Sequence, residues 1–242
     1  MKFKAACVAA MGMLCLQPAL AGPLDYVYTP TVEEGEKEID FKFGSADGHP
    51  RESQASLGFG YGVNDWWFTE VYVKYAKTGG GGTHYDAFEW ENKFQLTETG
   101  KYPVDVGFIT EIEIPNDRDE GRELKIGPLF QSEFGKVQVN GNILFEKHFD
   151  AAEPSPTEMG YQWQVKYRWH PVLEFGLQGF GDMGKWNHWE SHDDQSHKAG
   201  PAVFGKIPLE QHRAIRYNAA WLFGISDGAP DNTFRFQAEL EF

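Results

Sequence analysis

Apolar and polar residues alternate along most of this chain. The last ten residues, TFRFQAELEF, place Phe234 and Phe236 on an apolar face and charged or amide side chains on the other. The segment EMGYQWQVKYRW repeats the pattern, with an apolar residue at every second position from Met159 to Trp169. A period of two residues is that of a β-strand with two different faces. The pattern therefore predicts β-strands throughout the chain.

About twelve segments of roughly ten residues show this alternation. Ten residues that rise ~3.3 Å each and tilt by about 40° span about 25 Å, the apolar height of an outer-membrane barrel. An even number of strands is also typical of bacterial barrels. The predicted strands lie near 36–45, 51–62, 66–78, 85–97, 103–115, 121–134, 137–149, 157–169, 173–185, 198–207, 213–225 and 231–242.

The connections between these segments alternate between tight and long. Tight turns are expected near 62–65, 135–136, 170–171 and 208–212, and longer polar stretches such as TGGGGTH and NHWESHDDQSHKAG lie between them. Short turns at the periplasmic rim and long loops at the outer rim are typical of outer-membrane barrels. We therefore predict an all-β, transmembrane, antiparallel up-and-down β-barrel of about 12 strands over residues 36–242.

The last strand indicates how the sheet would close. A bilayer tolerates no unpaired backbone groups, so a sheet that spans it must pair its last strand with its first. The alternation that ends in Phe236, Leu240 and the terminal Phe242 resembles the C-terminal signal of bacterial outer-membrane β-barrel proteins of the porin-like channel class. The resemblance implies a monomer in outer-membrane lipid, inserted by the barrel-assembly machinery through this strand.

An exported β-sandwich is the alternative fold. Its inner faces would also be apolar and its outer faces charged. Bulky aromatic side chains across most of the apolar faces, and strands near ten residues rather than the usual five or six, favour the barrel.

Residues 1–21 have the features of a secretory signal peptide: a basic start, an apolar run and an Ala-Leu-Ala cleavage site. Cleavage after Ala21 would remove Cys7 and Cys15, so the mature protein would have no thiol for a disulfide or a metal site. Residues 22–35 form a lead-in rich in Tyr, Pro and Glu. The sequence allows this lead-in to lie in the periplasm or to tuck into the lumen.

The net charge of −14 narrows the range of partners. A strongly acidic chain repels phosphate, which argues against nucleic acid as a partner. A charged lumen would instead pass a small polar or charged solute. The acid excess favours cations, unless the basic residues of the late strands form the constriction. No cofactor is indicated by the sequence.

The polar faces of the predicted strands describe the lumen, and acids and bases are mixed there. Two alternatives follow: a hydrated selective path, or an ion-paired filler that holds a narrow barrel shut. A closed structural or ligand-binding barrel is therefore an alternative to a channel. The residues predicted to line the lumen are Glu70, Lys74, Glu89, Glu91, Lys93, Asp105, Glu111, Glu113, Lys125, Glu146, Lys166, Arg168, Arg216 and Arg235.

Residues 187–197 hold the densest set of metal-type ligands, including His188, His192 and His197. Their spacing matches no tight metal template, and a solvated loop explains the same composition. An outer-membrane hydrolase is the rival functional class. It would need a Ser–His pair on adjacent strands near the outer rim, and no persuasive pair of this kind is present. We expect a protein without catalytic residues.

Overall fold

The computed structural model describes residues 22–48, 50–211 and 213–242. The predicted signal peptide, residues 1–21 with both cysteines, lies outside the described residues. The described part is built from strands. They are β1 (Lys37–Ala46), β2 (Glu52–Asn64), β3 (Trp67–Thr78), β4 (His84–Gln95), β5 (Asp105–Pro115), β6 (Arg122–Phe134), β7 (Val137–Phe149), β8 (Glu158–His170), β9 (Leu173–Lys185), β10 (Ser196–Pro208), β11 (Ala214–Gly224) and β12 (Asn232–Glu241).

Each strand begins and ends within two residues of the bounds that the alternation predicts. The helical structure of the described part is one 3-10 turn, η1 (Arg118–Glu120), in the connection between β5 and β6. The Asp117 side chain caps this turn by accepting a hydrogen bond from the backbone N–H of Asp119. Within the described ranges, no helix is long and apolar enough to cross a bilayer.

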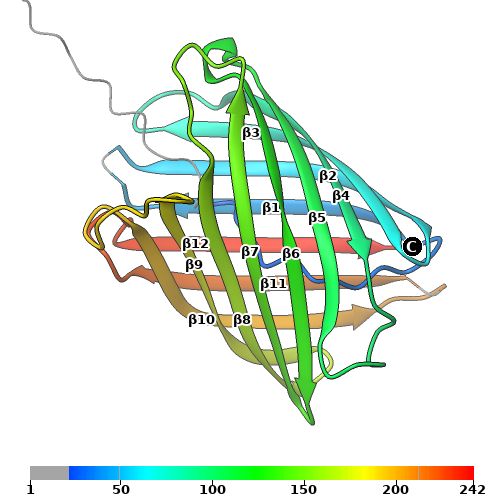
Figure 1. Cartoon of the computed structure of the whole chain (residues 1–242). Helices are drawn as coiled ribbons and strands as arrows, with labels where there is room; N and C mark the ends of the chain where they lie inside the picture. Colours follow the sequence, from blue (N-terminus) through cyan, green and yellow to red (C-terminus); the bar gives the residue numbers. More distant parts are fainter. Residues whose placement is uncertain (1–21, 49, 212) are drawn as a thin grey trace, which may run out of the picture.

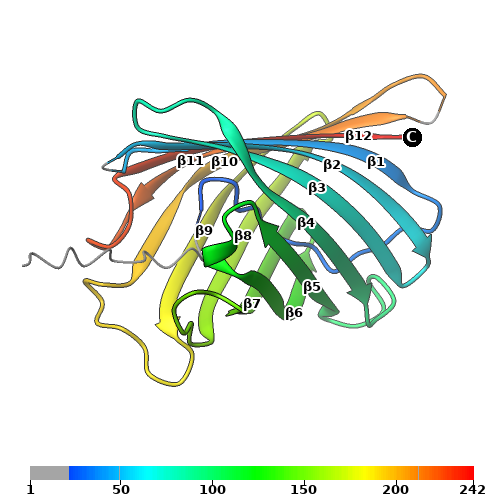
Figure 2. The same ribbon diagram turned by 90° about the horizontal axis from the view of Figure 1, so that it is seen from above.

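The sheet closes on itself (Figures 1 and 2). Every strand pairs antiparallel with its neighbours in the chain, and β1 also pairs with β12. In the closing register Ile39 lies opposite Leu240 and Phe43 lies opposite Phe236. The backbone N–H of Phe242 donates to the carbonyl of Lys37 at 2.9 Å. Closure leaves no open sheet edge, as a bilayer requires, and the predicted all-β antiparallel barrel is confirmed.

The two ends of the barrel differ in the length of their connections. We call the end where β1 begins and β12 ends the turn rim, and the opposite end the loop rim. Four turn-rim connections have five residues or fewer, but the fifth, 96–104, has nine. This connection is longer than the predicted bounds imply, because β4 ends two residues earlier and β5 begins two residues later than predicted. The loop-rim connections are 47–51, 79–83, 116–121, 150–157, 186–195 and 225–231.

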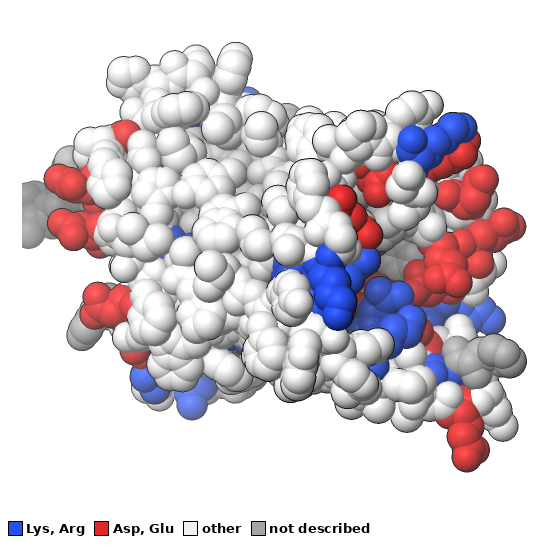
Figure 3. Space-filling view, turned by 90° about the horizontal axis from the view of Figure 1, so that it is seen from below, with Lys and Arg blue, Asp and Glu red and all other residues white. Residues whose placement is uncertain are grey.

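The outer face of the barrel is apolar. Leu57, Phe59 and Trp90 are among the many large apolar side chains exposed there. Figure 3 shows a broad band of surface without Lys, Arg, Asp or Glu, between charges gathered toward the two ends. A band of this kind faces acyl chains in a bilayer. Exposed Trp169 near the turn rim and Trp186 near the loop rim suit the membrane–water interfaces.

Candidate functional site

The polar faces of the strands point into the barrel. All fourteen residues predicted to line the lumen lie at inward-facing positions of their strands. Seven of them are buried, six are half-buried and Arg216 is exposed. They do not all border one continuous space. Ion pairs occupy the wall of the loop-rim half of the interior, whereas the turn-rim half contains a cavity.

In the loop-rim half, one lysine serves three carboxylates. Lys125 Nζ on β6 lies 2.9 Å from Glu111 Oε1 on β5, its cross-strand neighbour. The same ammonium lies 3.2 Å from Glu123 Oε1 and 3.7 Å from Glu146 Oε2 on β7. These groups are shielded from solvent, so their mutual attraction is strong and the loss of the lysine would be costly.

A second lysine of the loop-rim half has a similar arrangement. Lys74 Nζ on β3 lies 3.1 Å from Glu89 Oε2 on β4 and also pairs with Glu113 on β5. The side chains of all three residues are less than one-fifth exposed. Ion pairs therefore line the wall of this half of the lumen, as expected from one of the two alternatives that the sequence left open.

Residues 22–35, which we call the lumen segment, run through the barrel from the loop rim to the turn rim (dark blue in Figures 1 and 2). Near the loop rim, Lys198 Nζ donates to the carbonyl of Gly22 at 2.9 Å. Near the turn rim, the backbone N–H of Val32 donates to Gln95 Oε1 at 2.7 Å. Of the two placements that the sequence allowed, the structure has the one inside the lumen.

Two tyrosines anchor the lumen segment halfway along the barrel. The Tyr26 hydroxyl donates to Glu91 Oε2 at 2.5 Å, and the Tyr28 hydroxyl donates to Glu111 Oε2 at 2.7 Å. The Tyr28 carbonyl accepts from Asn142 Nδ2 at 3.0 Å. Hydrogen bonds to charged groups contribute about 1.5–3 kcal/mol each. The segment is therefore held by specific bonds to the wall.

Apolar packing adds to these bonds. Val27 packs into one inward cluster and Tyr28 into another. Both clusters consist of apolar residues at inward positions of a largely polar face. Such residues need an apolar partner inside the barrel, so they were a sequence signal for the position of the lumen segment. The wall residues of the two clusters are Phe180, Ala202, Phe204, Ala220 and Leu222 on β9–β11, and Ile109, Leu129 and Leu144 on β5–β7.

The turn-rim half contains a cavity of about 730 Å³, which we call the vestibule. Its lining runs from Glu36 and Lys206 near the rim to Tyr26 and Tyr72 deep in the barrel. Small-molecule sites usually measure about 300–1,000 Å³. The vestibule is therefore large enough for a small solute, and the lumen segment forms its inner end.

Basic and acidic side chains cluster on different sides of the vestibule. Figure 3 shows Lys and Arg side chains gathered beside a hollow toward the turn rim, with Asp and Glu next to them. Nine acidic and five basic residues line the vestibule, so its formal charge is negative. The basic side, from β8, β10 and β11, comprises Lys166, Arg168, Lys206 and Arg216. The acidic side, from β12, β1, β3 and β4, includes Glu38, Glu70, Glu91 and Glu239.

The basic residues of the late strands form two groups. Lys166, Arg168 and Arg216 line the vestibule. Arg235 lies deeper, is buried, and donates from Nη1 to Gln178 Oε1 at 2.7 Å. The four residues of the basic side each have a carboxylate partner, so they form a paired wall rather than a free cationic ring.

Two of the three histidines near the β9–β10 loop lie close together, with the ring centroids of His192 and His197 5.6 Å apart, but the three do not form a group of metal-type ligands among the described residues. His197 lies in β10 rather than in the loop, and both ring nitrogens are engaged: Nε2 lies 2.7 Å from Gln195 Oε1, and Nδ1 lies 3.0 Å from the Tyr161 hydroxyl. His188 and His192 are exposed in the loop. The three histidines are therefore not arranged as a joint ligand set.

Comparisons with known proteins agree with the barrel. No family model and no curated protein sequence matches the chain. The structure is similar to an outer-membrane channel from Pseudomonas putida F1, with a TM-score of 0.59 and 12% identity over 90% of this chain and 98% of that one. It is also similar to the KdgM porin in complex with disordered oligogalacturonate, with a TM-score of 0.55 and 8% identity over 85% and 98% of the two chains. The chain thus has the fold of bacterial outer-membrane β-barrel channels.

Proposed function

We propose that the protein is a monomeric, passive outer-membrane channel for a small polar or cationic solute. The vestibule carries this proposal, because it is a cavity of suitable volume with clusters of acidic and basic residues in its lining. Walls of opposite sign orient a polar solute, and an acid excess concentrates cations. The turn rim would face the periplasm, and the C-terminal strand would engage the assembly machinery.

The lumen segment would control the path. It stands between the vestibule and the loop rim, and its covalent link to the barrel is at the turn rim, where β1 begins. Cleavage after Ala21 would leave Gly22 as a free terminus near the loop rim. A segment with one free end can withdraw toward the turn rim, because no part of the chain has to follow it through the barrel. We therefore propose that its displacement opens the channel.

A closed, ligand-binding barrel is the second candidate. The hydrogen bonds of Tyr26 and Tyr28 and the two apolar clusters favour it, because they hold the lumen segment in place. In that case the vestibule would bind its solute without passing it. We propose no catalytic role for either form.

The acid excess also bears on the class of solute. KdgM is described in complex with oligogalacturonate, an oligomer of a sugar acid. A vestibule with nine acidic and five basic residues disfavours such an anionic chain. We therefore propose cation preference for this channel.

Neutralising two vestibule acids is expected to weaken the cation preference. Glu38→Gln/Glu239→Gln removes two carboxyl groups that line the vestibule. We expect the cation-to-anion permeability ratio to fall roughly twofold or more. Reversal potentials in a KCl gradient measure this ratio, in a background that lacks residues 22–34 so that the path is open.

The matched control is Glu153→Gln/Glu210→Gln, which makes the same charge change at two exposed sites in connections outside the strands. It should leave the permeability ratio unchanged. Anion preference in the background protein without either double substitution would contradict the proposal. An equal change of the permeability ratio in both double variants would also contradict it.

A further inference from the structure

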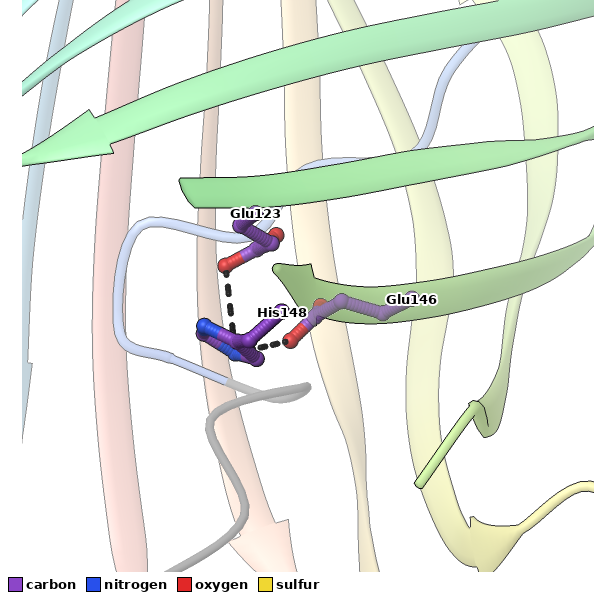
Figure 4. A group of neighbouring side chains, drawn as sticks. All are labelled: Glu123, Glu146 and His148. Carbon is purple, nitrogen blue, oxygen red and sulfur yellow. Dashed lines mark ion pairs between the residues drawn. The ribbon is translucent and has the colours of Figure 1, made fainter. Parts of the chain in front are cut away.

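A histidine and two glutamates meet on the inner wall near the loop rim, away from the vestibule (Figure 4). His148 Nε2 on β7 lies 3.4 Å from Glu146 Oε1 and 3.9 Å from Glu123 Oε2 on β6. One ligand-type atom from each residue lies within 4.8 Å of those of the other two. The three side chains come from neighbouring strands, so the sheet itself sets their spacing.

The histidine ring is oriented toward the carboxylates. Its Nδ1 lies 3.1 Å from the backbone carbonyl of Glu120, the last residue of η1. A carbonyl can only accept, so the proton of a neutral His148 lies on Nδ1 and the lone pair lies on Nε2. Metal-binding histidines are commonly fixed in this way by a carbonyl on the other ring nitrogen.

Glu146 lacks hydrogen bonds that a buried carboxylate needs. The residue is only 2% exposed, and neither carboxylate oxygen accepts a hydrogen bond from another described residue. Glu123 is 7% exposed, and its Oε1 likewise accepts none. An unsatisfied buried charge is unfavourable by several kcal/mol. These oxygens have ion-pair contacts with Lys125 and His148 but no hydrogen bond from a described residue, so both carboxylates can still serve as ligands of a cation.

The charge balance around the cluster supports the same conclusion. Lys125 is the cation nearest to both glutamates, but its ammonium also pairs with Glu111 at a shorter distance. Glu158 lies directly across from Glu146 on β8 and adds a further carboxylate. Even when His148 is protonated, two positive charges, Lys125 and His148, face the four carboxylates of Glu111, Glu123, Glu146 and Glu158.

We propose that Glu123, Glu146 and His148 bind one divalent transition-metal ion of the Zn²⁺ class. One imidazole nitrogen with two carboxylate oxygens suits such ions, whereas Mg²⁺ and Ca²⁺ prefer oxygen ligands alone. Donors about 2.0 Å from a tetrahedral ion lie about 3.3 Å apart, so the donor separations of 3.4 and 3.9 Å need only small adjustments. The His148 side chain is 22% exposed, so the site can be reached from the loop rim and water can complete it.

Metal titration of chelator-treated protein (residues 22–242) in detergent tests this proposal. We expect one equivalent of Zn²⁺ to bind in calorimetry, and Co²⁺ to give a visible spectrum at the same stoichiometry. Glu146→Gln and His148→Gln should each weaken binding by about 100-fold or more, since a change to a direct ligand should exceed the roughly 10–100-fold loss that is typical for residues supporting a ligand. Excess Ca²⁺ and Mg²⁺ should not compete.

The matched control is His188→Gln/His192→Gln, which removes two exposed histidines of the β9–β10 loop. It should bind Zn²⁺ as the parent does. Heat-modifiable migration on gels verifies that each variant is folded, and the isosteric Glu146→Gln preserves the volume inside the barrel. The proposal is overturned by absence of stoichiometric binding, by unchanged affinity in folded Glu146→Gln and His148→Gln, or by loss of binding in the loop variant.

Discussion

Deletion of residues 22–34 is expected to raise the single-channel conductance on the order of tenfold, because a barrel of about twelve strands has an interior wider than its own side chains fill. In the intact protein the lumen segment occupies that space, and the Tyr26 and Tyr28 hydroxyls bond to Glu91 and Glu111, which are cross-strand neighbours on β4 and β5. Gly35, which pairs with Gly62, is retained so that the start of β1 is undisturbed. Conductance in planar bilayers measures the effect.

The companion variant Tyr26→Phe/Tyr28→Phe keeps the lumen segment but removes its two hydroxyl bonds to the wall. It should show brief openings to the level of the deletion variant, with the closed level of the intact protein between them. Equal conductance of the intact and deleted proteins would contradict a segment that controls the path. A deleted protein that folds but never conducts would favour the closed, ligand-binding barrel.

Lys125→Met is expected to destabilise the barrel by about 3–5 kcal/mol, the usual effect of breaking a buried ion pair by removing one partner. The substitution leaves Glu111, Glu123 and Glu146 without the cation that they share, while the volume of the side chain is nearly kept. Reversible unfolding in urea with lipid vesicles measures the free energy of unfolding.

The matched control is Lys101→Met, which breaks the ion pair with Glu98 in the connection between β4 and β5. Both side chains are at least half exposed. Such a pair contributes about 0–1 kcal/mol, so the free energy of unfolding should hardly change. A loss in Lys125→Met no larger than in Lys101→Met would show that the ion-paired half of the lumen does not stabilise the barrel.

The strands and their faces could be predicted because the two-residue period is a local property. Alternation at Phe234 and Phe236, or from Met159 to Trp169, identifies a strand without knowledge of its partners. Closure also followed from the sequence, because a bilayer requires every backbone group to be paired. Even the inward placement of Glu111 and Lys125 follows from this alternation.

The use of the interior could not be predicted in the same way. Whether Lys125 faces Glu111 depends on the register between β5 and β6, which the chain sets only when the barrel closes. The lumen segment has too short a pattern to indicate where it packs. Ile109 was a usable signal, since an apolar residue on the charged side of its strand needs something apolar to cover it. The two-residue spacing of Glu146 and His148 was a second usable signal, because residues two apart lie on the same face of a strand.

A cross-link between the lumen segment and the barrel wall tests the central claim most directly. The expected mature chain has no cysteine, so Val27→Cys/Ala220→Cys provides a unique pair within one apolar cluster. In protein folded in lipid vesicles, a short bismaleimide should join the two positions within one chain. Val27→Cys alone should resist a bulky, water-soluble maleimide that labels Asp193→Cys in the exposed loop. Rapid labelling of Val27→Cys in the folded protein, with no cross-link to Ala220→Cys, would place the segment outside the lumen.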